Sequence, residues 1–289
     1  MRAAGEPDLK LYGIFGYPLG HTVSPAIQNR AFEICKLKAI YFAFERPPAR
    51  FRFLMRNRKS LVLDGFNVTV PFKEIIIPYL DQLSREAKIV GAVNTVKKQN
   101  GRWLGYNTDI AGFLAGLRKI GFKLRGKSAV ILGAGGSARA IVYALAQNGV
   151  REISIVNRTG SRAQNLIRKF RRLLPKVQWT ACDFKSDNWR HALSRAHLLV
   201  NTTKVGLKKN DPLLVSKKLF PKRRILVYDL IYKPRQTPLL HVAAQLGHQV
   251  INGETMLLYQ GAKAFEIWTG KRAPIAEMRK ALRNALDSK

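Results

Sequence analysis

The sequence predicts an α/β protein of two domains, the second of which is a Rossmann-type, doubly wound parallel sheet. Three observations lead to this prediction. The chain has 289 residues, which is enough for two medium-sized domains. Short apolar runs alternate with amphipathic helical patterns along most of the chain, as they do in α/β folds. A glycine-rich turn, Gly133–Arg139, follows one of these apolar runs and opens a helical pattern.

In the first part of the chain, the runs LYGIFG, AIYFAFE and GFNVTV predict strands. Ser24 and Pro25 start the pattern SPAIQNRAFEICKL, which predicts a helix with a serine cap. Helices are also expected at FRFLMRNRK, at TDIAGFLAGLRKIG and, with a break at Pro78, at EIIIPYLDQLSREAKIV. The segment AVNTVKKQNGRWLGYN predicts a hairpin that turns at Gln99, Asn100 and Gly101.

The second part is more regular. The predicted strands are SAVILG, EISIVNR, VQWTACD, LLVNTT and ILVYDLIY, and helical patterns separate them. Strands that are apolar almost throughout are typical of a parallel sheet covered by helices on both faces. From Glu254 onward the sequence predicts two helices outside this alternation, which we expect to return to the first domain. The predicted domains are therefore residues 1–108 plus 254–289, and residues 109–253.

Composition excludes several classes of protein. The chain is 46% hydrophobic and 24% charged, so a packed core is expected and disorder is not. Cys35 and Cys182 stand in unrelated contexts, which argues against a disulfide framework or a metal site and fits a reducing cytoplasm. Glu6 and Asp8 do not suit a signal peptide, and no apolar run approaches the roughly 20 residues of a membrane helix. We expect a cytoplasmic protein without metal.

The net charge is unusual. Lysine and arginine total 51 against 18 acidic residues, so the formal charge is +33. A charge of this size predicts attraction to polyanions that weakens steeply with salt. The basic residues are spread over helices and turns, and no zinc-finger spacing or RNA-binding aromatic strand accompanies them. We interpret the charge as a general surface property, which leaves a basic proteome and an engineered surface as alternative origins.

The turn GAGGSAR matches the dinucleotide-binding pattern G-x-G-x-x-A. Its glycines permit a tight turn and close approach of a pyrophosphate to the amino end of the following helix. The residues assigned to this turn are Gly133, Ala134, Gly135, Gly136, Ser137, Ala138 and Arg139. A glycine pattern alone is weak evidence, but its place between a strand and a helix in a βαβ unit strengthens the prediction.

The end of the next predicted strand indicates which dinucleotide is bound. An NAD site commonly has an Asp or Glu there, about 20 residues after the glycines, which binds the ribose 2′-hydroxyl. This chain has Asn157, Arg158 and Thr159 at that place, followed by Arg162. Two guanidinium groups and a hydroxyl suit a 2′-phosphate, and no carboxylate repels it. The sequence therefore predicts NADP.

Four further segments combine small polar residues with glycine or proline: GYPLGHTVSP, NVTVPFK, GAVNT and GYNTD. Their hydroxyl, amide, ammonium and carboxylate groups suit a small polyhydroxy acid, although each segment by itself is more typical of a capped turn than of a site. Lys73 is the ammonium group in this set. It is interpreted either as a solvated lysine at a strand end or as a proton donor that faces a cleft.

Together these segments resemble shikimate dehydrogenases over nearly the full chain. The similar motifs occur in the same order: GYPLGHTVSP, NVTVPFKE, GAVNT, GYNTD, GAGGSAR, NRT, NTT, YDLIY and the final NG…ML..QG..AF..WTG. The resemblance implies a substrate-binding domain, an NADP-binding domain and a cleft between them. It implies reversible, NADP-linked reduction of 3-dehydroshikimate to shikimate on the route to chorismate and aromatic amino acids.

The resemblance also implies roles for individual residues. Lys73 and Asp109 are the expected catalytic pair, with Lys73 as general acid and base. The expected substrate-binding residues are Thr22, Ser24, Thr69, Asn94, Tyr232 and Gln260, with Thr22 and Ser24 at the carboxylate. Beyond the glycine turn and Asn157–Arg162, the expected neighbours of the nicotinamide are Thr202, Leu230, Gly253 and Met256. For Tyr232 and Met256, plain core packing is the alternative.

Some positions depart from the family pattern. Thr22 stands where serine is common, so a methyl group enters the carboxylate pocket, and Lys204 lies near the expected nicotinamide site. A quinate or quinate/shikimate dehydrogenase is the nearest alternative function. An alternative of another class is a non-catalytic, polyanion-binding protein on the same fold. The oligomeric state, monomer or homodimer, stays open.

Overall fold

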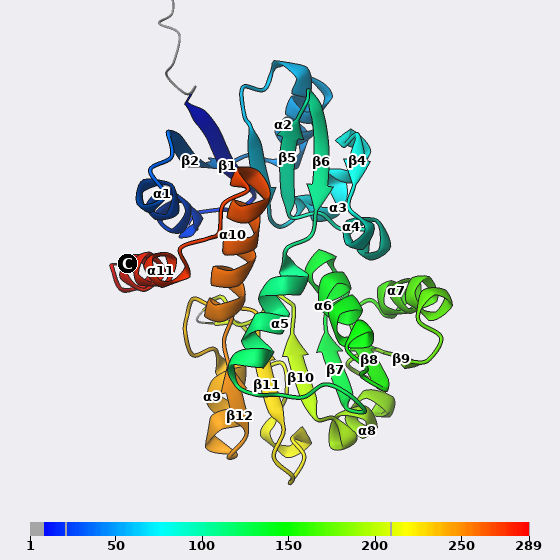
Figure 1. Ribbon diagram of the computed structural model, residues 1–289. Helices are drawn as coiled ribbons and strands as arrows, with labels where there is room; N and C mark the ends of the chain where they lie inside the picture. The colour runs from blue at the N-terminus through cyan, green and yellow to red at the C-terminus, as the bar shows by residue number, and fades with distance from the viewer. Residues whose placement is uncertain (1–8, 21, 209, 289) are drawn as a thin grey trace, which may run out of the picture. The chain divides into compact units, whose positions relative to one another are not determined.

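The computed structural model describes residues 9–20, 22–208 and 210–288. Glu6 and Asp8, which make the beginning of the sequence unlike a signal peptide, lie outside these ranges. The chain divides into two compact units (Figure 1). The first contains residues 1–112 and 258–289, and the second contains residues 113–257. Both expected classes of element are present, so the α/β prediction is confirmed.

The first unit is built on a mixed sheet of six strands in the order β2-β1-β3-β5-β6-β4. Its strands are β1 (Lys10–Gly16), β2 (Ala39–Glu45), β3 (Gly65–Val68), β4 (Gln82–Leu83), β5 (Thr95–Gln99) and β6 (Arg102–Tyr106). β1 pairs in parallel with β2 and β3, whereas β5 pairs antiparallel with both β3 and β6. The aromatic side chains of Phe15, Phe51, Phe66 and Phe72 pack together on this sheet and are almost completely buried.

The predicted hairpin is present. β5 and β6 are joined by Asn100 and Gly101, which both have positive φ angles, 51° and 74°. A two-residue turn of this kind requires the left-handed conformation at both positions, and asparagine followed by glycine adopts it at the lowest cost. The turn sets the register that places Thr95 opposite Tyr106.

The helices of the first unit are α1 (Ser24–Ile34), α2 (Pro48–Arg56), α3 (Phe72–Ile75), α4 (Arg85–Val90), and two short 3₁₀ turns, η1 (Arg58–Ser60) and η2 (Ile77–Tyr79). The predicted serine cap of α1 is wrong. Val23 is the N-cap residue and Ser24 already lies in the first turn, where its backbone N–H donates to Oγ1 of Thr22 over 3.3 Å. The hydroxyl that accepts a hydrogen bond at the start of α1 therefore belongs to Thr22, two residues before the predicted Ser24.

The helical pattern predicted from Glu74 to Val90, with a break at Pro78, is only partly right, because β4 (Gln82–Leu83) interrupts it after the break. Pro78 has no N–H and its ring opposes helix continuation, so α3 ends at Ile75 and only η2 follows. The carboxylate of Asp81 then accepts the backbone N–H of Trp103 over 2.7 Å, and β4 pairs with β6. Ser84 starts α4 with a hydrogen bond from the N–H of Ala87 to its Oγ. Sheet pairing therefore competes successfully with helical periodicity in this segment.

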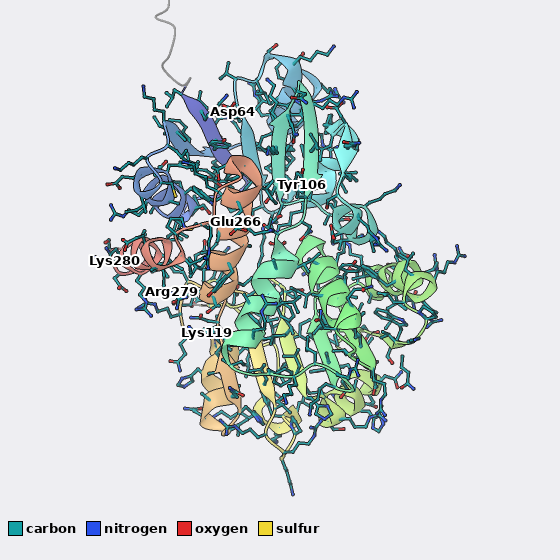
Figure 2. All side chains as sticks on the ribbon, viewed as in Figure 1. Asp64, Tyr106, Lys119, Glu266, Arg279 and Lys280 are labelled. Atoms are coloured by element: carbon teal, nitrogen blue, oxygen red, sulfur yellow. The ribbon has the colours of Figure 1, made fainter. Side chains whose placement is uncertain are left out.

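The predicted return of the last two helices to the first domain is confirmed. They are α10 (Glu254–Thr269) and α11 (Ile275–Asp287), and residues from 258 onward belong to the first unit. The indole Nε1 of Trp268 donates to the carbonyl of Val96 over 2.9 Å. Arg279, labelled in Figure 2, donates to the hydroxyl of Tyr259 over 3.3 Å and so connects the two helices.

The second unit contains an all-parallel sheet of six strands in the order β12-β11-β10-β7-β8-β9. Its strands are β7 (Ser128–Leu132), β8 (Glu152–Val156), β9 (Gln178–Cys182), β10 (Leu198–Asn201), β11 (Leu226–Asp229) and β12 (Gln249–Ile251). Chain order reverses between β7 and β10, as in the dinucleotide-binding fold. The prediction of a Rossmann-type sheet is confirmed.

Helices cover both faces of this sheet. They are α5 (Asp109–Lys119), α6 (Gly136–Gln147), α7 (Gly160–Leu173), α8 (Asp187–Arg195) and α9 (Pro238–Gln245), with a 3₁₀ turn, η3 (Lys217–Leu219). On one face, Trp189 and Leu193 of α8 and Leu239 of α9 join the buried strand residues in one apolar cluster. On the other face, Phe113 of α5 stacks on Tyr228 of β11 with ring centroids 5.0 Å apart. No helix of the described residues is long and apolar enough to cross a membrane.

Candidate active site and dinucleotide site

Lys73 lies in the first turn of α3, directly after β3. Thr69 holds the strand end in place, since its N–H donates to the carbonyl of Phe15 and its carbonyl accepts the N–H of Phe72. Phe72 is completely buried and stacks on Phe51 with ring centroids 4.0 Å apart. Because the neighbouring side chain is anchored in the core, the direction of the Lys73 side chain is fixed by the backbone.

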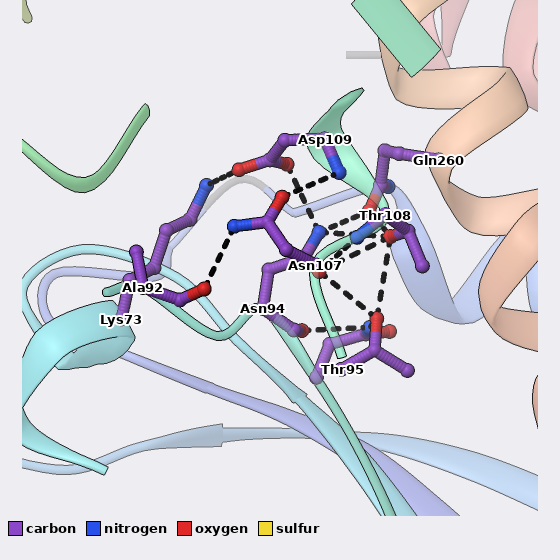
Figure 3. Close-up of polar contacts among 9 residues, drawn as sticks. Lys73, Ala92, Asn94, Thr95, Asn107, Thr108, Asp109 and Gln260 are labelled. Carbon is purple, nitrogen blue, oxygen red and sulfur yellow. Dashed lines mark hydrogen bonds and ion pairs between the residues drawn. The ribbon is translucent and has the colours of Figure 1, made fainter. Parts of the chain in front are cut away.

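The ammonium group of Lys73 forms an ion pair with Asp109. The distance from Nζ to Oδ2 is 2.5 Å, and the two side chains are only 11% and 4% exposed (Figure 3). Asp109 is the first residue of α5, where a carboxylate also interacts favourably with the helix dipole. A charge pair this well shielded from water is screened little by salt. The structure thus brings together the two residues that the sequence analysis paired.

Asn94 holds the other oxygen of the same carboxylate. Its Nδ2 lies 2.9 Å from Oδ1 of Asp109, 2.9 Å from Oγ1 of Thr108 and 3.2 Å from Oε1 of Gln260 (Figure 3). Its own Oδ1 accepts the backbone N–H of Thr108 over 2.7 Å. Asn94 therefore connects the end of the hairpin, the start of α5 and the side chain of Gln260 on α10.

A second, deeper row of polar groups supports Asn94. The phenol of Tyr41 donates to Oδ1 of Asn67 over 2.7 Å, and Nδ2 of Asn67 donates to the carbonyl of Asn94 and to Oγ1 of Thr95. Burial raises the pKa of Tyr41 well above its ordinary value, so the phenol stays a donor. Every hydrogen bond in this row lies inside the unit, which makes the backbone at residue 94 rigid.

Several of these polar residues were not among the predicted site residues: Tyr41, Asn67, Thr95, Asn107 and Thr108. Four of the five lie inside the motifs NVTVPFK, GAVNT and GYNTD. A signal was present at Asn67, since it is an amide within the apolar strand run GFNVTV. For Tyr41, which comes from a different strand, no local signal existed.

Thr22, Ser24 and Thr69 lie just beyond the carboxyl ends of β1 and β3. These strands are parallel neighbours, so their ends meet at one edge of the sheet. The N–H of Tyr17 donates to the carbonyl of Val70 over 3.0 Å and joins the two connections. Thr22 and Thr69 are partly exposed and Ser24 is 8% exposed. Hydroxyl groups are thus available at this edge.

In the second unit, Gly133 has a φ of +109° and its N–H donates to the carbonyl of Val156 over 2.8 Å. A Cβ at this glycine would come within 2.5 Å of Oγ1 of Thr202, so a larger residue does not fit. A Cβ at Gly135, the N-cap residue of α6, would meet no atom within 4 Å. The turn therefore leaves open space at a helix amino terminus, where the helix dipole favours an anion, and this fits a pyrophosphate.

The segment after β8 has the features expected for a 2′-phosphate site. Arg158, Thr159 and Arg162 are exposed, and the amide of Asn157 donates to the carbonyl of Thr159 over 2.9 Å. Thr159 is the N-cap residue of α7, and its side chain forms no cap hydrogen bond. Two guanidinium groups beside an uncapped helix amino terminus, without a carboxylate in the segment, fit a phosphate group.

The carboxyl ends of β10 and β11 are held by Asp229, which the sequence analysis did not select. Its buried carboxylate accepts hydrogen bonds from Nδ2 of Asn201 (3.0 Å), the N–H of Ile231 (3.0 Å) and Oγ1 of Thr237 (2.7 Å). Burial raises the pKa of this carboxyl, and the hydrogen bonds act in the opposite direction. Asp229 and Asn201 lie in the quoted motifs YDLIY and NTT.

The expected nicotinamide residues lie at this same edge of the second unit. The hydroxyl of Thr202 donates to the carbonyl of Leu132 over 2.7 Å. A Cβ on Gly253 would overlap the carbonyl of Leu230, so the chain passes too closely there for any other residue. Met256 is 7% exposed.

Tyr232 and Lys204 complete the expected positions of the second unit. Burial raises the pKa of the Tyr232 phenol, and Lys204 is exposed. Among the described residues, no group of three or more His, Cys, Asp or Glu side chains is placed to hold a metal ion.

Comparison with known proteins assigns the family. Three family models match the chain: the shikimate dehydrogenase substrate binding domain at residues 14–96, shikimate / quinate 5-dehydrogenase at residues 116–207, and the shikimate 5′-dehydrogenase C-terminal domain at residues 253–283. The chain is 40% identical to shikimate dehydrogenase (NADP(+)) of Symbiobacterium thermophilum, over 99% of this chain and 98% of that protein.

Two further proteins show the same likeness. Shikimate dehydrogenase (NADP(+)) of Methanopyrus kandleri is 40% identical over 96% of each chain. The crystal structure of shikimate 5-dehydrogenase from Thermus thermophilus in complex with NADP(H) and shikimate is 35% identical, with a TM-score of 0.83 over 96% of this chain and 100% of that one. The sequence, the folds of both units and these full-length matches agree: the chain belongs to the shikimate dehydrogenase family.

Proposed function

We propose that this protein is an NADP-dependent shikimate dehydrogenase, an oxidoreductase that reversibly reduces 3-dehydroshikimate to shikimate in the biosynthesis of aromatic amino acids through chorismate. The observation that carries the proposal is the shielded ion pair between Lys73 and Asp109, 2.5 Å apart, next to the hydroxyl-rich edge of the first sheet. The NADP-dependent relatives and the open glycine turn before α6 support the choice of reaction and cofactor.

Lys73 and Asp109 carry the proton chemistry in this proposal. Bound NADPH supplies the hydride that converts the substrate's carbonyl carbon into a secondary alcohol carbon. The ammonium group of Lys73 donates one proton to the oxygen as negative charge develops on it, and the resulting amine is protonated again from solvent. In the oxidative direction the neutral amine accepts the hydroxyl proton. Asp109 keeps Nζ in one position and stabilises its cationic form.

Polar residues of the first unit, together with Tyr232 of the second, would bind the substrate. In this proposal Thr22 and Ser24 bind its carboxylate, and the ring hydroxyls or the carboxylate contact the remaining residues, which are Thr69, Asn94, Asp109, Tyr232 and Gln260. Asn94 is the best supported member, since it already connects Asp109, Thr108 and Gln260 by hydrogen bonds. A polyol needs such a set of paired donors and acceptors, because each unpaired hydroxyl would cost binding energy.

The second unit would hold the cofactor. The turn Gly133–Arg139 binds the pyrophosphate, Arg158, Thr159 and Arg162 bind the 2′-phosphate with Asn157, and the nicotinamide lies near Thr202, Leu230, Gly253 and Met256. We accordingly propose residues 1–108 and 254–289 as the substrate-binding catalytic domain and residues 109–253 as the NADP-binding domain. The proposed location is the cytoplasm, and the protein acts as a monomer or homodimer.

Quinate is the competing substrate within this family, and a family model that matches residues 116–207 names both. Thr22 is the position that bears on the choice, since its methyl group changes the shape of the carboxylate pocket. The decisive experiment measures oxidation of shikimate and of quinate, each with NADP and with NAD. We expect shikimate with NADP to give the highest kcat/KM. A preference for quinate with NAD would overturn the proposal.

The high positive charge also leads us to propose non-specific, salt-sensitive binding of polyanions by a highly basic surface. A purely polyanion-binding protein without catalysis is the alternative of another class. It has no need of the buried Lys73–Asp109 pair, which is why we favour the enzyme. Turnover that is absent under all four assay conditions, together with polyanion binding that persists at physiological salt, would favour this alternative.

A further inference from the structure

A row of basic residues, four of them cationic at neutral pH, lies along one edge of the parallel sheet in the second unit. Each of its six strands is preceded, within two residues, by a lysine, arginine or histidine. In the order of the sheet from β12 to β9 these residues are His248, Arg224, His197, Lys127, Arg151 and Lys176. Because all six strands are parallel, their starting points lie at the same edge. With Arg195 and Arg223 added, we call this row the basic edge.

Backbone hydrogen bonds join the members of the row. The N–H of Arg151 donates to the carbonyl of Lys127 over 2.8 Å, and the carbonyl of Arg151 accepts the N–H of Gln178 over 2.8 Å. Five intervals of about 4.8 Å between neighbouring strands make the row roughly 24 Å long. This length corresponds to about seven base-pair steps of duplex DNA at 3.4 Å each.

Three charges of the basic edge face water, whereas Lys127 and His197 are half-buried and His248 is 6% exposed. Arg151, Lys176 and Arg224 are exposed. Val177 and Ile225, which alternate with them at the strand starts, are 8% and 3% exposed. The exposed side chains of the row itself are therefore cationic, and the exposed apolar side chains close to it in the chain include Leu173 and Leu246, 51% and 42% exposed.

Acidic residues are scarce at this edge. Residues 113–257 contain 27 lysines and arginines but six aspartates and glutamates. Five of the six acidic residues lie away from the strand starts: Asp183, Asp187, Asp211, Asp229 and Glu254. Glu152, at the start of β8, is the acidic residue of the row and pairs with Arg195 over 3.2 Å.

The pKa of His197 depends on several positive charges of the row. Its pKa is lowered first by burial and then by the positive charges of Arg223, Lys127 and Arg151. These three residues precede three different strands, β11, β7 and β8. Cations from three strand starts thus act together on one imidazole in the middle of the sheet.

We propose that the basic edge binds the phosphate backbone of nucleic acid without sequence preference. This assigns a surface and a partner to the general polyanion binding proposed above, and it does not depend on the dehydrogenase reaction. Cations at four strand starts, three of them exposed, with buried apolar neighbours match a regularly charged, polar backbone. The proposed NADP residues lie at the carboxyl ends of the strands, about 17 Å away along a five-residue strand, so both ligands can be held at once.

The test uses the full-length protein and a short fluorescein-labelled DNA duplex, with fluorescence anisotropy measured between about 50 and 200 mM salt. The edge variant combines Lys127→Gln, Arg151→Gln, Lys176→Gln and Arg224→Gln. It retains Arg223, whose guanidinium donates to the carbonyl of Ala196, and Arg195, which pairs with Glu152. The matched control combines Arg50→Gln, Arg52→Gln, Arg56→Gln and Lys59→Gln, four exposed residues of the first unit, and removes the same net charge.

The basic edge has six positively charged residues, which are Lys127, Arg151, Lys176, Arg195, Arg223 and Arg224. Six phosphate contacts predict a slope of log K against log salt of roughly −5 for the unaltered protein. The edge variant retains two of these residues, which predicts a slope of roughly −2. The control variant should retain a slope near that of the unaltered protein. Equal losses in both variants would overturn the proposal, since net charge alone would then govern binding. Tighter binding of polyglutamate or of phosphatidylserine vesicles than of DNA would also overturn it, in favour of an acidic protein or a membrane.

Dehydrogenase turnover of both variants is measured separately with shikimate and NADP. We expect it to equal that of the unaltered protein, because the substituted residues lie outside the proposed catalytic and cofactor groups. The failure of DNA binding and the failure of the proposed enzyme function are therefore distinguishable. An NMR titration provides a local readout: the pKa of His197 should rise when the duplex binds, because phosphates offset the cationic field. An unchanged His197 would place the DNA elsewhere.

Discussion

Asn94 and Lys73 hold the two oxygens of one carboxylate, that of Asp109. Nδ2 of Asn94 lies 2.9 Å from Oδ1, and Nζ of Lys73 lies 2.5 Å from Oδ2 (Figure 3). A carboxylate fixed at both oxygens cannot rotate, so the ammonium group that it binds is also fixed in direction. The arrangement gives Asp109 a positioning role for Lys73, and it gives Asn94 the same role for Asp109.

Replacing Lys73 tests the proton donor. Lys73→Ala should lower kcat for shikimate oxidation by roughly 10²–10⁴-fold, the range for loss of a positioned acid–base group. KM for shikimate should change much less, because the hydroxyl and amide groups around the pair remain. Lys88→Ala, at an exposed position of α4, is the control. A kcat within about twofold of the unaltered enzyme would remove Lys73 from the chemistry.

Replacing Asn94 tests the support of the carboxylate. Asn94→Ala removes the donor to Asp109 and leaves the N–H of Thr108 without its acceptor. A lost hydrogen bond to a charged group corresponds to about 1.5–3 kcal/mol, so we expect kcat to fall by roughly 10–100-fold. Urea unfolding should show a loss of about 1–3 kcal/mol for the unpaired buried groups.

The control for Asn94 is Asn148→Ala, which removes a side-chain hydrogen bond to the carbonyl of Ala144 at the end of α6. This variant should unfold slightly more easily while kcat stays unchanged. If Asn94→Ala lowers stability but leaves kcat intact, the residue is structural and does not position Asp109.

The preference for NADP should depend on the segment after β8. Arg158→Gln combined with Arg162→Gln removes both guanidinium groups that we assign to the 2′-phosphate. We expect KM for NADP to rise by roughly 10–100-fold, as one or two charge-assisted hydrogen bonds are lost, while KM for NAD stays nearly constant. Arg168→Gln combined with Arg172→Gln on the same helix, α7, is matched in charge. Equal effects of the two pairs on NADP would contradict the assignment.

Acid should destabilise the second unit. Burial and nearby cations lower the pKa values of His197 and of His248, whose nearby cation is Arg224. When a folded-state pKa lies below the unfolded one, the unfolded chain binds more protons in the interval between them. The stability that each neutral histidine contributes is complete above the ordinary pKa of about 6.5 and is lost as the pH falls through the lowered folded value.

Urea unfolding at a series of pH values from about 7 to 5 measures this loss. His197→Gln should reduce the decline in unfolding free energy, because the variant has no proton to gain at this position. His191→Gln, an exposed residue of α8, should leave the decline as it is. A decline that is identical in all three proteins would show that His197 does not contribute.

Local sequence was sufficient for much of the fold. The alternation of apolar strands with helices, the asparagine–glycine hairpin and the glycine turn before α6 each depend on neighbouring residues, and each was predicted. Within the segment from Glu74 to Val90, the predicted break at Pro78 and the final helix are present, but the strand β4 was not predicted, for a physical reason. The helical periodicity there was outweighed by the pairing of β4 with β6, a strand about 20 residues further along the chain, which no local pattern reports.

The fold class, the dinucleotide turn and the candidate residues of the site could be predicted from the amino-acid order, because they follow from local periodicity, glycine geometry and ordered motifs. Three relationships required the folded molecule. Lys73 contacts the carboxylate of Asp109, 36 positions away in the chain, and Tyr41 and Asn67 hold Asn94 through hydrogen bonds. The basic residues before six parallel strands lie in one row. The reason is that hydrogen bonds and charge interactions depend on distances of a few ångströms in space, and strand pairing sets those distances between segments far apart in the chain.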